Sequence, residues 1–480
     1  MATIAVGAGA GASGGPKTMA FKDKDKPYEI VTSPTSVLVS NDGATILKNM
    51  SVLHPCAKML VELSEAQDAE TGDGTTSVVV IAGALLNAAE GLLEKGIHPT
   101  VIAESFLLAS RKAVEALESV SITVDLSDRA SLIWSASTSL NSKIVSQLAP
   151  MMSAVAVDSI LRVADLSECS VDLNDIRVIQ KLGCTLEDLE LMDAGGLLLR
   201  QPAVSSASGP LKMEKAKIGL IQFQLSPPKT DMESQVVVTD YRQIDKILKE
   251  EREYLLNICK KIKKANCNVL LVQKSILRDA LSEMALNFLS KLKVMVISDI
   301  ERDEIDFIAK TLGCKPIADI SSFSEDKLGS ADLVEEISME GACSKYVRVS
   351  GIKNGGKTAS VLVRGASQVV LDEAERSLHD ALCVLRCLVR KKQLIAGGGF
   401  PESYLSSFLG QWASHSLSGK ASICVDAYAR ALDVVPITLS ENAGLDPLTM
   451  VTELRSRHAQ GESNCGINIR KVVARCISKL

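Results

Sequence analysis

The chain has 480 residues, enough for two or three domains, and 46% of them are hydrophobic, which supports globular cores. A formal net charge of -5 at pH 7 gives no basic bias toward nucleic acid. We expect no membrane partner, because we find no apolar run of spanning length and no secretory pattern at the N-terminus. Twelve cysteines without a CxxC pair indicate reduced thiols in a cytosolic protein, and five isolated histidines give no metal-site spacing.

Residues 1–25 are rich in Gly, Ala and Ser and then in Lys and Asp, which is typical of a flexible tail. Gly9, Gly11 and Gly14 follow a short apolar run and imitate a dinucleotide-binding fingerprint. The charged run at residues 22–26 stands near the place where such a fingerprint needs an amphipathic helix. We therefore expect no dinucleotide site here.

From Leu47 to Leu117 and from Ser127 to Val163, apolar residues recur at helical spacing. Within this region, residues 69–77 read Ala-Glu-Thr-Gly-Asp-Gly-Thr-Thr-Ser, a glycine-rich turn that opens a helix. Such a turn lets the backbone approach a ligand, and helix N-termini attract phosphate. Asp73 would then hold a divalent cation that bridges to the phosphate, since magnesium prefers oxygen ligands. The alternative is that Asp73 only caps the helix.

Composition changes between Ala216 and Ala318, where β-rich runs alternate with helical patterns. This alternation predicts an α/β domain inserted in a helical one. The expected strands are 218–223, 268–272 and 294–297, and the expected helices are 241–264, 277–292 and 302–312.

Residues 351–358 satisfy the Walker A pattern, Gly-x4-Gly-Lys-Thr. A P-loop needs a strand before it and a helix after it, but here a second β-rich run, 359–363, follows the first, 346–349. We predict a β-hairpin around residues 354–356. A P-loop or dinucleotide enzyme remains the alternative built on these two patterns.

The last third is helical again. Helical patterns cover 371–389, which carries Asp380, then 403–412 and 420–439, with a glycine triplet at 397–399. The first and last thirds are therefore predicted to form one helical domain that the α/β insert divides, so that Leu47–Leu117 and Ser403–Leu439 share a core.

Four strings in this order resemble the group II chaperonins: 37–47 around Asn41-Asp42-Gly43, 69–77, 375–382 around Asp380, and 394–399. The resemblance runs from about residue 23 to about residue 470. It implies a multi-domain α and α/β fold with a discontinuous helical equatorial domain, a small intermediate domain, and an inserted α/β apical domain whose helical protrusion forms a lid. The implied bounds are 1–25 for the tail, 26–135 and 398–480 for the equatorial domain, 136–195 and 361–397 for the intermediate domain, and 196–360 for the apical domain.

The resemblance also implies a function: a cytoplasmic subunit of a double-ring hetero-oligomer that binds unfolded proteins and assists their folding, driven by hydrolysis of ATP with Mg2+. Asp42 and Asp380 would be catalytic, positioning and activating the attacking water, and Asp73 would hold the magnesium. The cofactor-binding residues would be Gly43, Gly72, Gly74, Thr75, Thr76, Gly398 and Gly399.

This sequence departs from the family in two places. The family's Leu-Gly-Pro-Lys-Gly-Met-Asp-Lys phosphate loop is absent before Asn41, and Lys471–Leu480 do not resemble the family's end. The alternative is therefore a truncated, non-enzymatic isoform, or an incomplete gene model, that has lost ATP binding and ring assembly. We expect this chain to hydrolyse ATP poorly or not at all.

Overall fold

The computed structural model describes residues 19–22, 29–32, 37–165, 169–192, 196–204, 209–227, 241–275, 279–338, 345–352, 356–460, 465–468 and 473–476. The glycines at positions 9, 11 and 14 lie outside these ranges. The chain divides into two compact units, one of residues 1–153 with 377–480 and one of residues 154–376. Two helices, α6 (Ala149–Val163) and α10 (Gln368–Lys391), run across this division. The predicted intermediate-domain bounds stay a prediction.

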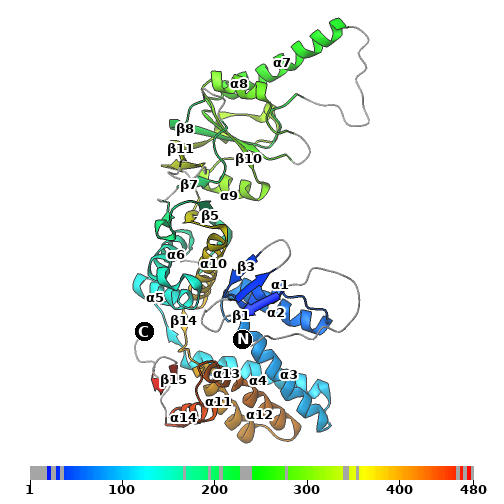
Figure 1. Ribbon diagram of the computed structural model, residues 1–480, viewed down its shortest axis with the longest axis vertical. Coiled ribbons are helices and arrows are strands. Elements are labelled where there is room, and N and C mark those ends of the chain that lie inside the picture. Colours follow the sequence, from blue (N-terminus) through cyan, green and yellow to red (C-terminus); the bar gives the residue numbers. More distant parts are fainter. Residues whose placement is uncertain are drawn as a thin grey trace. The chain divides into compact units, whose positions relative to one another are not determined.

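The first unit is mainly helical (Figure 1). Its early helices are α1 (Gly43–Asn49), α2 (Pro55–Thr71), α3 (Thr75–Glu94), α4 (Pro99–Val120) and α5 (Arg129–Leu140). Its late helices are α11 (Phe400–Ser416), α12 (Lys420–Leu432), α13 (Val434–Asn442) and α14 (Pro447–Ala459). The predicted helix 420–439 is thus two helices, which meet at Asp433.

Short strand pairs complete this unit. An antiparallel sheet has the order β1 (Met19–Lys22), β2 (Glu29–Thr32), β3 (Val37–Ser40). β4 (Ile122–Thr123) pairs with β14 (Gln393–Leu394), and β15 (Cys465–Asn468) pairs with β16 (Val473–Cys476). Four residues of the predicted flexible tail therefore lie in a strand, because their backbone groups find partners on β2.

Helices from both ends of the chain share one core in this unit. Ala109 and Ala113 of α4 pack with Leu409 of α11 and Val425 of α12, and all four are buried. Figure 1 shows α11 and α12 beside α3 and α4. The core shared between Leu47–Leu117 and Ser403–Leu439 is therefore confirmed.

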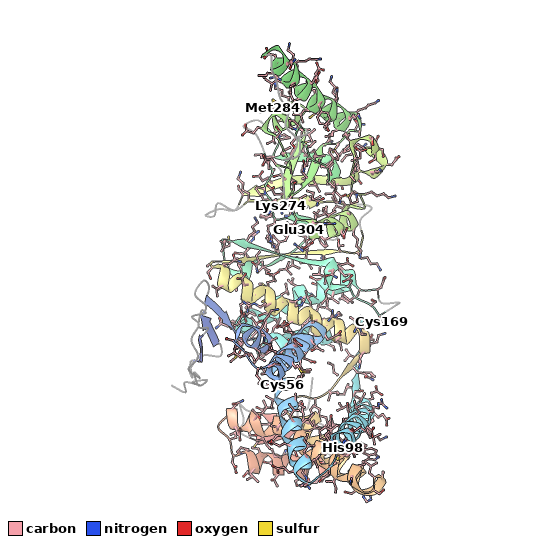
Figure 2. All side chains as sticks on the ribbon, turned by 90° about the vertical axis from the view of Figure 1, so that its right-hand side faces the viewer. Cys56, His98, Cys169, Lys274, Met284 and Glu304 are labelled. Atoms are coloured by element: carbon pink, nitrogen blue, oxygen red, sulfur yellow. The ribbon has the colours of Figure 1, made fainter. Side chains whose placement is uncertain are left out.

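Local signals set where these helices begin. Proline occupies the first turn of α2 and of α4, where its missing N–H costs nothing. The preceding histidines act as caps: His54 Nδ1 accepts the Cys56 N–H at 3.2 Å, and His98 Nδ1 accepts the Thr100 N–H at 3.3 Å. Figure 2 labels His98 at this position. These two histidines have a structural role as helix caps.

Two stretches, Thr75–Glu94 and Ile144–Val163, are long and apolar enough to cross a membrane by length and composition alone. This corrects our expectation that no run reaches that length. The expectation was wrong because Thr, Ser, Asn and Gly break the continuous apolar runs but carry no charge, so the mean hydropathy of the whole stretch stays high. Only 6% of the apolar window in α3 is buried in the structure.

The second unit contains a six-stranded sheet with the order β10-β9-β8-β11-β12-β7. Its strands are β7 (Leu197–Leu199), β8 (Lys212–Ile221), β9 (Val269–Gln273), β10 (Met295–Ile300), β11 (Gly329–Ser338) and β12 (Lys345–Ser350). β8, β9 and β10 are parallel, while β11 and β12 are antiparallel to their neighbours. The buried runs of β8, β9 and β10 match the strands predicted from the β-rich segments.

Helices cover this sheet: α7 (Tyr241–Lys264), α8 (Glu283–Lys291) and α9 (Arg302–Leu312). Figure 1 shows α7 and α8 at one end of the unit. The predicted bounds of α7 and α9 are confirmed. The helix predicted at 277–292 is shorter, because residues 279–282 include a bend and a bridge residue and are not helical, so that α8 begins at Glu283.

The predicted hairpin around residues 354–356 is wrong. β12 pairs with β11 and β7 in the large sheet, whereas β13 (Ala359–Gly365) pairs with β5 (Ile176–Leu182) and β6 (Glu190–Leu191) in a separate sheet. The segment between β12 and β13 therefore leads from one sheet to another. Strand pairing depends on residues far away in sequence, so adjacency of two β-rich runs did not fix it.

Candidate functional site

The candidate site lies within the helical unit and begins with Asp42, a buried residue that precedes α1. Its Oδ2 accepts the Thr45 hydroxyl at 2.6 Å and the Thr45 N–H at 3.0 Å, and its Oδ1 accepts the Thr75 hydroxyl at 3.4 Å. Asp42 thus caps α1 and also joins it to the start of α3.

The Gly-Asp-Gly turn lies between α2 and α3. Gly72 has φ 69° and Gly74 has φ 74°, in the left-handed region that glycine adopts easily. Asp73 is exposed, and its Oδ1 accepts the Gly74 N–H at 2.8 Å. Because Gly74 has no side chain, the first N–H groups of α3 have no side-chain cap, which leaves them available to an anion.

Two glycines bring these elements close together. A Cβ on Gly43 would lie 2.2 Å from Thr76 Cγ2, and a Cβ on Gly72 would lie 2.8 Å from the Asp380 Cα. No side chain fits at such distances. Gly43 therefore lets α1 approach α3, and Gly72 lets the turn approach α10.

Asp380 lies on α10, and its carboxylate meets a lysine that the sequence analysis did not select. Lys143 Nζ lies 2.5 Å from Asp380 Oδ2 and 3.9 Å from Asp42 Oδ1. Only 6–7% of each of these three side chains is exposed. The structure therefore brings together Asp42 and Asp380, which are 338 positions apart in the sequence, around one buried ammonium group.

Burial and charge set the protonation of this cluster. Burial raises the pKa of Asp380 to about 7, although the Lys143 ammonium opposes the rise. Burial also acts to raise the pKa of Asp42, but the Thr45 hydroxyl and Lys143 outweigh it and hold that pKa below its usual value. The pKa of Lys143 is raised, because the attraction of Asp380, Asp42 and Asp73 outweighs its burial. Lys143 is therefore charged, and Asp380 can exchange a proton near neutral pH.

A fourth carboxylate, on Asp68 of α2, belongs to the same electrostatic group and was also missed. Burial raises the pKa of Asp68, and the charge of Asp42 raises it further. The loop that carries Lys143 is tied to the Asp42 turn, since Asn41 Nδ2 donates to the Ser142 carbonyl. Residues 137–143 adjoin no recognised motif. The sequence therefore gave no reason to predict that Lys143 belongs to the site.

Gly398 and Gly399 contact a different set of neighbours, at the start of α11. The Gly398 carbonyl accepts the Ile467 N–H at 2.9 Å, and a Cβ on Gly399 would lie 3.1 Å from Pro436 Cβ of α13. α13 in turn packs against α3. The start of α11 is therefore connected to α3 by way of α13, which contacts both. The predicted contact of Gly398 and Gly399 with a nucleoside stays a prediction.

Two lysines that adjoin glycine-containing strings, Lys357 and Lys48, are largely exposed. Lys357 of the Walker-like string forms an ion pair with Asp165 and is 62% exposed, and β13 rather than a helix follows it. Lys48 Nζ lies 3.6 Å from Glu65 and is 68% exposed. Within the described ranges, no three His, Cys, Asp or Glu side chains are grouped to hold a metal ion. A magnesium ion held by Asp73 would therefore take its other ligands from phosphate and water.

The chain has a helical unit formed from its first and last parts, an α3 N-terminus without a side-chain cap, and an α/β unit inserted between those parts. This is the architecture of a chaperonin. The chain belongs to the TCP-1/cpn60 chaperonin family, whose model matches residues 28–479.

Among its relatives, T-complex protein 1 subunit delta of Schizosaccharomyces pombe is 61% identical over 443 residues, which cover 92% of this chain and 83% of the relative. The human T-complex protein 1 subunit delta is 54% identical over 494 residues, covering 97% and 90%. A solved open-state monomer of a group II chaperonin from Methanococcoides burtonii matches with a TM-score of 0.63 and 29% identity, covering 84% of this chain and 92% of that one.

These comparisons confirm the fold class and the resemblance on which it was predicted. They assign the chain a chaperonin subunit's role in protein folding. The alignment with the human relative spans 494 positions, more than the 480 residues of this chain, so it includes positions that this chain lacks.

Proposed function

We propose that this chain is a subunit of a cytoplasmic, ATP-dependent chaperonin hetero-oligomer arranged as a double ring, which binds unfolded proteins and assists their folding. The observation that carries the ATP site is the convergence of the uncapped start of α3, the exposed Asp73 and the buried Asp42–Lys143–Asp380 cluster in one unit.

The donor set fits a magnesium nucleotide. The first N–H groups of α3 have no side-chain cap and can donate to phosphate oxygens, and exposed Asp73, whose Oδ1 accepts the Gly74 N–H, offers carboxylate oxygens to a cation. We assign phosphate contacts to the glycines and threonines of the two turns and nucleoside contacts to the triplet before α11. These residues are Gly43, Gly72, Gly74, Thr75, Thr76, Gly398 and Gly399.

Magnesium and ATP, when bound, supply charge neutralisation and the phosphoryl group that passes to water. We assign to Asp42, which accepts hydrogen bonds from the Thr45 and Thr75 hydroxyls, the positioning of the attacking water. Asp380 can accept a proton from an attacking water, because its pKa of about 7 is matched to neutral conditions. Lys143 holds both carboxylates in place. Positioning and charge supply most of such a reaction.

This chain should nevertheless turn ATP over slowly, because the family's phosphate loop and its lysine are absent. Charge-assisted hydrogen bonds contribute about 1.5–3 kcal/mol each, and each ~1.4 kcal/mol is tenfold in affinity. Loss of several should weaken ATP binding by orders of magnitude.

The test is magnesium-dependent ATP turnover by the purified chain, beside a version with the family's phosphate-loop segment restored before Asn41. We expect turnover from the restored version, its loss on Asp380→Ala, and a far lower rate from the chain itself. Equal rates from the two would show that the loop is dispensable. A restored version without magnesium-dependent turnover would contradict the proposed ATP site.

A further inference from the structure

Two cysteines lie opposite each other in the register of β15 and β16. These strands are antiparallel, and Cys465 pairs with Cys476 in their ladder. Directly opposed residues of an antiparallel pair have Cα atoms about 4.5–5.5 Å apart, and a disulfide needs about 4.4–6.8 Å. Within the described ranges, no other strand pairing places two cysteines opposite each other. The backbone register therefore meets the distance requirement of a disulfide between these two residues.

Cys465 also has a cation beside it. Its side chain is buried in the core that it forms with Met450 and Leu454 of α14, and burial disfavours a thiolate. The Arg457 guanidinium opposes this effect. It donates hydrogen bonds to Glu453 and to the Cys465 side chain, and both interactions raise the pKa of Arg457. A guanidinium beside a thiol stabilises the thiolate, which is the form that attacks a disulfide sulfur.

The strand pair can gain stability from a covalent link. β15 and β16 form a two-stranded sheet, and an isolated pair of this kind is marginally stable in water. The helical unit holds β15 firmly, because the Ile467 N–H donates to the Gly398 carbonyl at 2.9 Å and both Cys465 and Ile467 belong to the α14 core. A bond between the strands would therefore fix β16 to a strand that is already anchored.

We propose that Cys465 and Cys476 form a reversible disulfide, a modification site that fixes β16 to β15 under oxidising conditions. The co-reactant is a low-molecular-weight disulfide. The Cys465 thiolate attacks one of its sulfurs and displaces a first small thiolate. The Cys476 thiolate then attacks the Cys465 sulfur and displaces the second, and the two cysteine protons pass to the released thiolates. The chain loses two electrons, and the small disulfide is reduced to two thiols. This site is independent of the proposed ATP site.

The test is equilibration of the full, reduced chain with mixtures of reduced and oxidised glutathione, followed by acid quenching, alkylation and tryptic digestion. Trypsin separates the two cysteines into the peptides 458–470 and 476–479. A disulfide between them joins these peptides, and mass spectrometry measures the joined and the separate forms. We expect the joined form to accumulate as the proportion of oxidised glutathione rises and to disappear with dithiothreitol. Its absence at every glutathione composition would overturn the proposal.

The effect of the register must be separated from that of short chain distance, because the two cysteines are only 11 positions apart in the sequence. The same equilibration in concentrated urea measures how readily they pair in the unfolded chain. At equal glutathione composition, the ratio of joined to separate peptides should be about tenfold or more higher in the native chain, because the fold holds the two residues at bonding distance. A native ratio no higher than the ratio in urea would overturn the proposal, since the fold would then not favour the bond.

Variants test which residues take part. Cys476→Ser should abolish the joined peptide, whereas Cys56→Ser, which removes an exposed thiol, is the matched control and should leave its yield unchanged. Arg457→Gln should slow the closing of the native pair about threefold or more and leave pairing in urea unchanged, because the guanidinium has a fixed place beside Cys465 only in the fold. A native rate unaffected by Arg457→Gln would overturn the assignment of Cys465 as the attacking sulfur. Linkages that involve Cys56 in preference to Cys465 would overturn the proposal, because exposure rather than register would then decide the pairing.

Discussion

Replacement of Asp380 by Asn should change how the stability of the helical unit depends on pH. Burial raises the pKa of Asp380 in the folded chain to about 7 from an ordinary value of 3.8. The fold therefore prefers the protonated acid. The contribution of Asp380 to stability is most favourable below the unfolded value, and it is lost as pH rises between the two values.

The size of the effect follows from these two values. Each pH unit between them costs about 1.4 kcal/mol, so the unsubstituted chain should lose about 2–3 kcal/mol from this group between pH 5 and pH 7.5. Asn does not titrate. The stability of Asp380→Asn relative to the unsubstituted chain should therefore increase by about that amount over the same interval, while other titrating groups cancel in the comparison.

The assay is urea unfolding followed by tryptophan fluorescence at the two pH values. Both tryptophans of the chain, Trp134 and Trp412, lie in the same unit as Asp380, so the signal reports on that unit. Asp372→Asn, on the same helix, is a control for the loss of a negative charge alone. A stability difference that does not change with pH would refute the reasoning, since it would mean that Asp380 is not destabilised by burial.

Three further outcomes are expected. Gly72→Ala should lower the free energy of unfolding of the helical unit by about 1–3 kcal/mol or more, because φ is 69° and the new Cβ would clash with the Asp380 backbone. An unchanged midpoint of urea unfolding would contradict this close approach. Lys143→Met should lower the free energy of unfolding by about 3–5 kcal/mol near pH 7.5, and by less at pH 5, where Asp380 can become neutral. Equal losses of stability at the two pH values would argue against the ion pair. Lys357→Ala should leave magnesium–ATP binding unchanged by calorimetry in the version with the phosphate-loop segment restored, since this lysine pairs with exposed Asp165; lost binding would revive the P-loop interpretation.

Local sequence signals predicted most of the helices and the strands of the α/β unit. The charged helical pattern predicted both ends of α7, whereas Leu47–Leu117 was predicted as a stretch of helical spacing, within which the structure begins α2 and α4 with a proline after a histidine cap. Pairing between distant segments was less predictable. β12 and β13 are neighbours in sequence but join different sheets, because their partners, β11 and β5, are set by the tertiary fold.

The same limit applies to the candidate site. Asp73 occurs in a glycine turn whose chemistry is visible in the sequence, and Asp42 was selected through the family resemblance of its Asn-Asp-Gly string. Lys143 follows α5 without such a signal, and only the fold brings it between Asp42 and Asp380. The functional roles of these residues remain predictions, while their proximity is a property of the fold.

The burial of this cluster is itself an argument for function. A buried ion pair gives little net stability, because removing two charges from water offsets their attraction. Two aspartates around one lysine leave an excess negative charge, and burial raises the pKa of Asp380 to about 7 despite the nearby ammonium. Replacing a buried ion pair or triad by hydrophobic residues of similar volume is often neutral or stabilising. Perturbed carboxyl groups gather where a protein moves protons or holds charge, and here they lie beside the uncapped end of a helix. We therefore propose that the arrangement serves chemistry on a phosphate rather than the stability of the fold.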